Sequence, residues 1–240
     1  MVYDDDTQAS EEAARYALSA SALDELRGQT AVKSEQLGLG GCRNHTVRID
    51  PTSWHGLLPD ELAGRDNISR GDVFDMAAHP RNLTSVFAAS FIWGTGRIGY
   101  GPRRLREIVD GAGGNLESSL VAAKVTADTD LIEGYATLYG GHDPKHRVAA
   151  QTPPYVRIDR YGPAFFTKFL YFTTPGALIL DNVLANAVHG LTQMPHLVAR
   201  NGKPYAWSPY RYAVYLHWMN ATAASVGVTP ELLEFTLFNS

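Results

Sequence analysis

Apolar residues recur every three or four positions along most of this chain, which is the spacing of amphipathic α-helices. Five such runs follow one another between Ile68 and Gly141, and they are separated by short joints rich in proline, asparagine and glycine. The clearest start is Ser69, with Asp72 three positions later, an arrangement typical of a helix N-cap. Successive amphipathic helices with short connections predict an all-α bundle.

The second half of the chain predicts four more helices. One carries Lys168, and a second apolar run predicts a helix over Leu178–Leu191. Ser208-Pro209 and Thr229-Pro230 each place a good N-cap residue before a proline at the first helical position. We therefore expect the last two helices to start at these two sites.

Two segments interrupt the helical pattern. Residues 1–50 begin acidic, become helix-compatible over Ala9–Arg27 and then reach the cluster Gly38-Leu39-Gly40-Gly41, which predicts an N-terminal appendage of a helix and a loop. The remaining residues, 51–240, form the main domain in this interpretation. Within it, residues 141–161 contain three prolines and little periodicity, so we expect a linker between two helical lobes.

Composition limits the class of protein. With 240 residues and 45% hydrophobic side chains, the chain can bury one sizeable core or two lobes that share an interface. Its single cysteine, Cys42, excludes an intrachain disulfide. The longest apolar run, Val86–Trp93, is much too short to span a bilayer, and the acidic start is unlike a signal peptide. We expect a soluble, cytoplasmic protein without a membrane partner.

Positive charge is unevenly distributed, although the formal net charge is −4. Arg97, Arg103, Arg104 and Arg106 fall within ten positions, and a second basic group ends at Arg160. Affinity for DNA depends on where such charge lies and not on the total. Short basic runs are also common on solvated faces, so the clusters alone do not establish DNA binding.

Lys168 is the strongest candidate for chemistry, because it is the only charged residue between Arg160 and Asp181 and phenylalanines surround it in sequence. An ammonium group among apolar side chains loses hydration, which favours the neutral, nucleophilic amine. Asp181 follows 13 positions later and could lie across from the amine. The alternatives are a surface lysine on an amphipathic helix and an aspartate that only caps the next helix.

Over roughly residues 155–190 the chain resembles the helix-hairpin-helix DNA glycosylases, in which a glycine-containing hairpin leads into a helix with a catalytic lysine and an aspartate follows. It is most similar to the compact bacterial proteins with an 8-oxoguanine glycosylase (OGG) fold and to the archaeal 8-oxoguanine glycosylases. The more common hairpin of that superfamily has two glycines flanking one apolar residue, whereas this chain has Gly162-Pro163-Ala164-Phe165-Phe166-Thr167.

The resemblance implies an all-α, two-lobed helix-hairpin-helix glycosylase fold, with Lys168 and Asp181 as the catalytic pair. It implies double-stranded DNA containing a modified base as the partner, and we expect a monomer that needs no cofactor. The single cysteine excludes the four-cysteine iron–sulfur cluster of some members of this superfamily. The residues expected to contact DNA are Gly162, Arg97, Arg103, Arg104 and Arg160.

A flipped base needs a stacking platform, and large aromatic residues are the candidates. Most large aromatics at helical spacing belong to a core, but some of them could line a base pocket. The candidates for the base pocket are Trp54, Trp93, Phe165 and Trp207.

Two other motifs carry weaker signals. Residues 94–99 match the dinucleotide fingerprint G-x-G-x-x-G, but the preceding segment has helical periodicity instead of the strand that the fingerprint needs. A glycine-rich loop that offers backbone amides to a DNA phosphate is the better interpretation. His142 and His146 are four positions apart, but Pro144 lies between them, so we predict no metal site.

The leading hypothesis is a DNA N-glycosylase that excises a modified base and leaves an abasic site. Two substrates remain open, an oxidised base such as 8-oxoguanine, which implies repair, and a hypermodified or glucosylated cytosine of phage DNA, which implies antiviral defence. Strand nicking through a Schiff base also remains open. The alternatives from other classes are a non-catalytic helix-hairpin-helix DNA-binding module and a helical protein-interaction domain.

Overall fold

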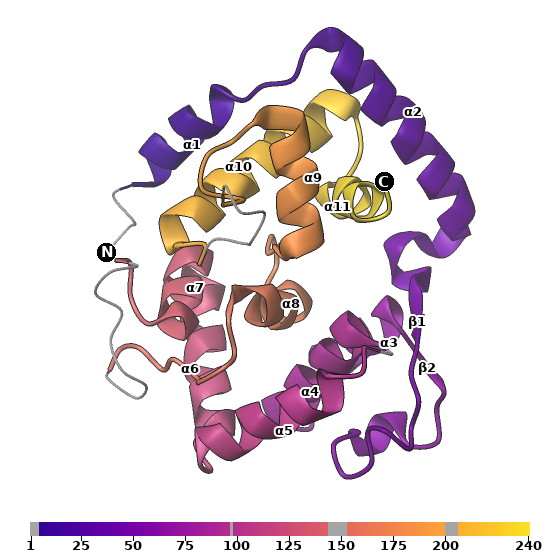
Figure 1. Ribbon diagram of the computed structural model, residues 1–240, viewed down its shortest axis with the longest axis vertical. Helices are drawn as coiled ribbons and strands as arrows, with labels where there is room; N and C mark the ends of the chain where they lie inside the picture. Colours follow the sequence, from indigo (N-terminus) through magenta and orange to yellow (C-terminus); the bar gives the residue numbers. More distant parts are fainter. Residues whose placement is uncertain (1–4, 97, 144–152, 200–205) are drawn as a thin grey trace.

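The computed structural model describes residues 5–96, 98–143, 153–199 and 206–240 (Figure 1). Within these ranges the chain forms eleven α-helices, two 3₁₀ helices and one pair of short strands. The all-α class is thus confirmed. The N-terminal half contains α1 (Asp6–Ala14), α2 (Ala20–Leu37), the 3₁₀ helix Gly38–Asn44, β1 (Thr46–Arg48), the 3₁₀ helix Asp60–Leu62, β2 (Asn67–Ser69), α3 (Arg70–Ala78), α4 (Leu83–Thr95) and α5 (Gly101–Ala112). The rest contains α6 (Leu116–Thr129), α7 (Leu131–Tyr139), α8 (Pro163–Thr173), α9 (Asn182–Thr192), α10 (Pro209–Val226) and α11 (Pro230–Phe238).

Side-chain caps fix most of the helix starts that the sequence predicts. At α3, the Ser69 hydroxyl accepts a hydrogen bond from the Asp72 amide at 2.9 Å, and the Asp72 carboxylate accepts one from the Ser69 amide at 2.8 Å. This reciprocal arrangement is a capping box, which satisfies two backbone donors at once. Caps also begin the later helices, from Asn82, Asp130, Ser208 and Thr229.

The two strands were not predicted from the sequence. They pair antiparallel, with Thr46 opposite Ser69 and Val47 opposite Ile68. Three residues are too few to show the alternating pattern that marks a strand. The pairing has a structural consequence, because it brings His45 beside the first turn of α3, where the Arg70 amide donates to the His45 carbonyl oxygen at 2.8 Å.

Helix α8 lies in the centre of the molecule, with α3, α4 and α5 on one side and α9, α10 and α11 on the other (Figure 1). It packs against α3, α4, α6 and α7. Its apolar residues are the reason for this position, because Phe166, Phe169 and Leu170 are each at most 1% exposed. A residue on α8 is therefore placed between these two groups of helices.

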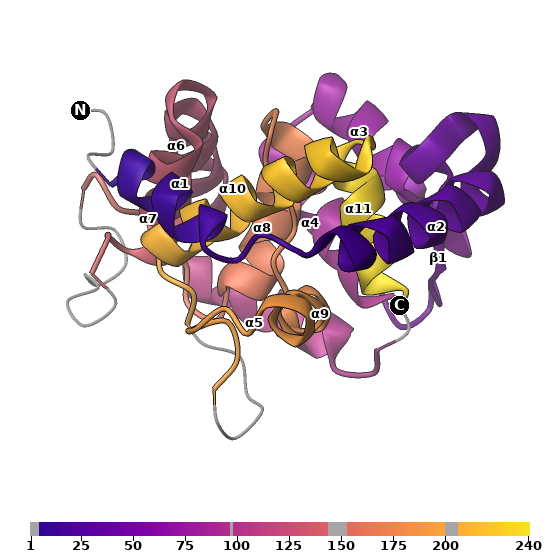
Figure 2. The ribbon, with the colours of Figure 1, turned by 90° about the horizontal axis from the view of Figure 1, so that it is seen from above.

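The N-terminal helices pack along the C-terminal ones, as Figure 2 shows for α1 and α2 beside α10. The Glu12 carboxylate accepts hydrogen bonds from the Tyr210 hydroxyl at 2.6 Å and from the Arg211 guanidinium at 2.7 Å. Burial raises the pKa of Glu12, but the hydrogen bonds and the charge of Arg211 outweigh it and hold the pKa below its ordinary value. The N-terminal residues thus share the core of the molecule, and a domain boundary at residue 50 stays a prediction.

The predicted helix over Leu178–Leu191 is wrong at its start. Residues 178–180 are not helical, and α9 begins only at Asn182. Side chains from distant elements bind the backbone of this segment: the Ile179 amide donates to Glu234 at 2.6 Å, and the Tyr215 hydroxyl donates to the Ile179 carbonyl oxygen at 2.7 Å. Because these partners satisfy the backbone without a helix, the buried segment remains non-helical and places Asp181 at the N-terminus of α9.

Candidate active site

The structure brings Lys168 and Asp181 together. The Lys168 ammonium donates to the Asp181 carboxylate at 2.9 Å and to the Ala164 carbonyl oxygen at 2.8 Å. The two side chains are 7% and 14% exposed, so the pair is largely removed from water. Both charges are costly to bury alone, and each therefore depends on the other.

Asp181 has two structural roles at the same time. Its Oδ2 accepts from Lys168, while its Oδ1 caps α9 by accepting from the Val183 and Leu184 amides at 3.1 and 3.2 Å. The capping interpretation and the pairing interpretation are thus both correct for this residue. The cap fixes the carboxylate, which leaves one oxygen directed at the amine.

Gly94 makes room for the Lys168 side chain. A Cβ atom at position 94 would lie 2.3 Å from Lys168 Cδ and 2.6 Å from Cε. Such distances are far inside van der Waals contact, so a side chain at position 94 would force the lysine onto another path across α4. Gly94 is also the first residue of the G-x-G-x-x-G match. The match begins inside α4, so the residues before it are helical and do not form the strand that the fingerprint needs.

A cavity of about 600 Å³ opens on the hairpin side of the pair. Its lining includes Gly162, which precedes α8, as well as Arg160, Phe165 and Trp207. Gly162 is the N-cap of α8 with Pro163 at the first helical position, as the sequence predicts. Four of the lining residues are apolar and at least 39% exposed, namely Ile98, Tyr100, Val183 and Phe238.

Three of the predicted DNA-contacting arginines converge on one carboxylate. Arg160 donates to Glu107 at 2.8 Å, and the Nε atoms of Arg103 and Arg104 lie 3.8 and 3.9 Å from its oxygens. Their side chains remain between 33% and 77% exposed. The group thus presents positive charge near the hairpin, whereas Arg97 lies outside the described residues.

The candidate base-pocket aromatics do not gather in one place. Phe165 and Trp207 line the 600 Å³ cavity, and the Phe165 ring stacks on Phe91 with centroids 4.8 Å apart. Trp93 lines a second cavity, described next. Trp54 contributes to neither; it is 1% exposed and packs beside Gly101, away from the pair.

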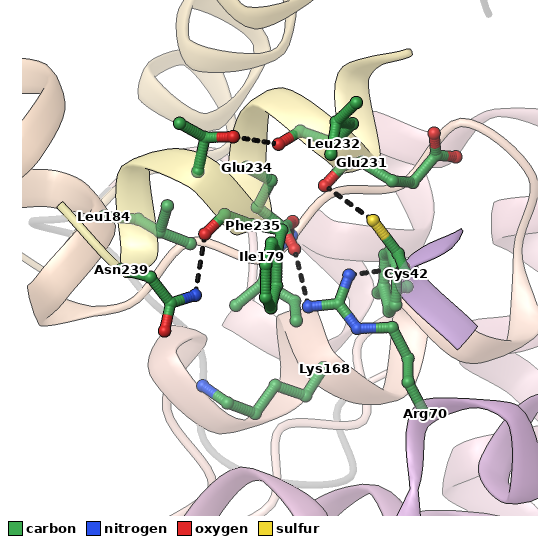
Figure 3. Close-up of polar contacts among 12 residues, drawn as sticks. Cys42, Arg70, Lys168, Ile179, Leu184, Glu231, Leu232, Glu234, Phe235 and Asn239 are labelled. Atoms are coloured by element: carbon green, nitrogen blue, oxygen red, sulfur yellow. Dashed lines mark hydrogen bonds and ion pairs between the residues drawn. The ribbon is translucent and has the colours of Figure 1, made fainter. Parts of the chain in front are cut away.

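The second cavity, of about 230 Å³, lies on the other side of the amine. It shares Gly94, Lys168 and Asp181 with the larger cavity, and its remaining walls include a buried ion pair between Arg70 and Glu234. These two side chains are 3% and 1% exposed, with 3.5 Å between Arg70 Nη2 and Glu234 Oε1 (Figure 3). Burial, only partly offset by the charge of Arg70, raises the pKa of Glu234 to about 7.

Sequence reasoning did not single out Gly94 as a partner of the lysine, nor Arg70, Glu234 and His45 as cavity residues. A usable signal existed for Glu234, which interrupts the apolar run of α11. Among the described residues, no group of three or more histidine, cysteine, aspartate or glutamate side chains is arranged to hold a metal ion. His142 lies 3.1 Å from Glu133, and His146 is outside the described residues.

A family model described as "Putative 8-oxoguanine DNA glycosylase OGG-like protein" matches residues 40–238. The chain belongs to this OGG-like family. The match includes both members of the lysine–aspartate pair. Neither a curated protein nor a solved structure matches the chain. Within the part of the OGG-like chain that the structure describes, no helix combines the length and apolar character needed to cross a membrane.

Proposed function

We propose that this protein is a DNA N-glycosylase that extrudes a modified base, breaks its bond to deoxyribose C1′ and leaves an abasic site. The observation that carries the proposal is the buried Lys168–Asp181 pair. Both residues line the 600 Å³ cavity and the 230 Å³ cavity, and Asp181 is the N-cap of α9. Membership of the OGG-like family supports the same reaction.

DNA binding in this proposal uses the hairpin side of the molecule. The arginines around Glu107 contact phosphates, which supplies affinity without reading sequence. Extruding a nucleotide unstacks the duplex at a cost of a few kcal/mol. The exposed apolar side chains at the rim of the larger cavity suit the role of a wedge that occupies the stack after the base has left.

The chemical step uses both members of the pair. As the glycosidic bond lengthens, the Asp181 carboxylate stabilises the positive charge that develops on the sugar. Lys168 then passes one proton to Asp181 along their 2.9 Å hydrogen bond, and the neutral amine attacks C1′. A bond forms between Nζ and C1′ as the bond to the base breaks, and the departing base takes up the second proton that Nζ loses. The C1′–O4′ bond of the sugar then opens, O4′ takes up the proton held by Asp181, and the protonated Schiff base that results permits strand nicking. In the hydrolytic variant, Asp181 activates water and Lys168 only positions the DNA.

The substrate is the finer part of the proposal. An oxidised base such as 8-oxoguanine implies DNA repair, and a hypermodified or glucosylated cytosine of phage DNA implies antiviral defence. Both leave an abasic site, so the same assay detects either.

The test is incubation with duplexes that contain 8-oxoguanine, glucosylated 5-hydroxymethylcytosine or unmodified bases, followed by alkali to reveal abasic sites. We expect cleavage of one modified duplex by the wild type and none by Lys168→Gln. Lys124→Gln is the matched control, because it removes a lysine–carboxylate pair of similar length, with Asp128 at 2.7 Å, from the exposed face of α6. DNA binding without abasic sites on any duplex would refute the enzyme and favour the binding module.

Borohydride separates the two mechanisms. A Schiff base is reduced to a stable adduct, so the amine mechanism predicts a covalent protein–DNA band that Lys168→Gln lacks. Base release without such a band would remove the amine mechanism and leave hydrolysis.

A further inference from the structure

The non-helical segment before α9 is held by side chains from other helices. The Tyr212 hydroxyl donates to the Leu178 carbonyl oxygen at 2.7 Å and accepts from the Leu178 amide at 3.2 Å. Ile179 is also bound on both sides, by Tyr215 and Glu234, as described above. These bonds fix the first two residues of the segment to α10 and α11.

The last residue of the segment is fixed to α8 by Thr167, which is 0% exposed and directly precedes the lysine. Its hydroxyl accepts from the Leu180 amide at 3.2 Å and donates to the Pro163 carbonyl oxygen at 2.7 Å. The Leu180 carbonyl oxygen, at 3.4 Å, is the more distant of two acceptors for its single proton. Because Leu180 directly precedes Asp181, Thr167 attaches the backbone beside the carboxylate to the lysine helix.

Thr167 and Lys168 connect the same two segments in parallel. Each side chain donates to the carbonyl oxygen four positions earlier on α8, at 2.7 Å for Thr167 and 2.8 Å for Lys168. Each also bonds to the residue 13 positions later, which is Leu180 for the threonine and Asp181 for the lysine. The short β-branched threonine is stiff, whereas the lysine has a flexible four-carbon stem. The threonine bond therefore sets the spacing of the two segments more closely than the ion pair can.

The position of the carboxylate depends on this spacing. Oδ1 of Asp181 is bound to the first turn of α9, and the backbone before Asp181 is bound to α8 through Leu180. The flexible lysine could follow a carboxylate that moved. The sugar of a nucleotide held by its phosphates could not, so a displaced carboxylate would lose its alignment with C1′.

We propose that Thr167 is a positioning residue for base excision, whose hydroxyl holds Leu180 against α8 and thereby aligns Asp181 with both the amine and the sugar. This inference rests on the glycosylase function proposed above. Thr167 acts through Asp181 and touches neither the base nor the reacting atoms. Its loss therefore slows the chemical step and leaves DNA binding unchanged.

The test measures kcat and KM on the modified duplex that the wild type cleaves. Thr167→Val keeps the shape of the side chain and removes the hydroxyl. We expect it to lower kcat about tenfold with KM unchanged, because the carboxylate is displaced but the DNA-binding surface is not. Thr167→Ser keeps the hydroxyl and is expected to restore kcat.

Thr173→Val is the matched control. Thr173 is also buried on α8, and its hydroxyl donates to the Phe169 carbonyl oxygen at 2.8 Å, within the same helix. Urea unfolding of each variant gives the loss of stability separately from the loss of kcat. If Thr167→Val does not fold, Thr167→Ser and Thr167→Ala give the same comparison, because they differ only by the hydroxyl.

Three results would overturn the positioning role while the wild type remains active. They are a wild-type kcat in Thr167→Val, an equal loss of kcat in Thr173→Val, and a raised KM with unchanged kcat, which would assign Thr167 to DNA binding. In each of these cases Lys168→Gln would still abolish base release, so the proposed function would stand. A wild type that releases base from no duplex would defeat the proposed function and this role with it.

Discussion

The Lys168 side chain reaches Asp181 along a path that crosses position 94, where a Cβ atom would lie 2.3 Å from the lysine Cδ. The geometry of the proposed catalytic pair thus depends on a contact between α4 and α8 as well as on the pair itself. This dependence leads to the first prediction.

Gly94→Ala is expected to reduce base release at least about 100-fold, because it displaces the amine by an amount comparable to a bond length. Overpacking is also expected to lower the free energy of unfolding by about 1–3 kcal/mol. Activity and urea unfolding should therefore be measured together. Gly190→Ala in α9 is the control, since its Cβ would have no atom within 4 Å and activity should not change. A fully active Gly94→Ala protein would contradict the assigned role of Lys168.

Asp181 can be tested by separating its charge from its cap. Asn caps helices about as well as Asp, whereas Ala does not. We expect Asp181→Asn and Asp181→Ala to lose base release equally, by about 100-fold or more. The free energy of unfolding of Asp181→Ala should be about 1 kcal/mol lower than that of Asp181→Asn.

Asp130 provides the comparison for this experiment, because it caps α7 through the Ile132 and Glu133 amides and has no part in the proposed chemistry. Asp130→Ala should show the stability loss alone. If Asp181→Asn kept wild-type activity, its negative charge would have no role in the reaction.

The buried Glu234 predicts a pH dependence of stability. Its pKa is raised from 4.5 to about 7 in the folded protein, so the folded state binds more protons than the unfolded state between these values. This contribution is fully present below pH 4.5 and is lost as the pH rises through about 7. The stability of the wild type relative to Glu234→Gln should therefore fall from pH 5 to pH 8 in urea unfolding.

The measurement uses the difference in free energy of unfolding between the wild type and Glu234→Gln, because His45 is present in both proteins and affects stability in the opposite direction. Its pKa is lowered from 6.5 to about 4, so its contribution is present above pH 6.5 and is lost as the pH falls through about 4. A wild-type advantage over Glu234→Gln that stayed constant from pH 5 to pH 8 would show that the carboxyl is ionised throughout.

The arginines around Glu107 predict a salt effect. Arg104→Ala should weaken binding to any duplex and reduce the slope of log affinity against log salt by about 1, as expected for one lost phosphate contact. Arg81→Ala is the control. Arg81 precedes the N-terminus of α4, whereas Arg104 follows its C-terminus, and Arg81 pairs with the exposed Asp60. Equal salt slopes for wild type and Arg104→Ala would exclude Arg104 from the interface.

Local sequence signals predicted the helix starts well. The caps at Ser69, Ser208 and Thr229 each depend on a side chain and an amide a few residues away, so the necessary atoms are neighbours in the sequence. The start of α9 was missed because Tyr215 and Glu234, which bind the backbone of the preceding non-helical segment, come from helices later in the chain.

The candidate site divides in the same way. Lys168 and Asp181 could be proposed from a short stretch of sequence, and the structure places them in contact. Arg70 and Glu234 could not, because a charged residue indicates a surface position unless its partner is known. Trp54 shows the reverse case, because this large aromatic residue considered for the base pocket is 1% exposed and lines neither of the two cavities at the pair.

The smaller cavity draws its walls from His45, Arg70, Trp93, Ile179 and Glu234, which come together only when the whole chain is folded. A denatured chain has no such site, so any molecule that occupies it must favour the native state. A free base present at 100 times its dissociation constant would add about 2.7 kcal/mol to the native state. The melting temperature of the protein can therefore rank free nucleobases as ligands without DNA and without turnover.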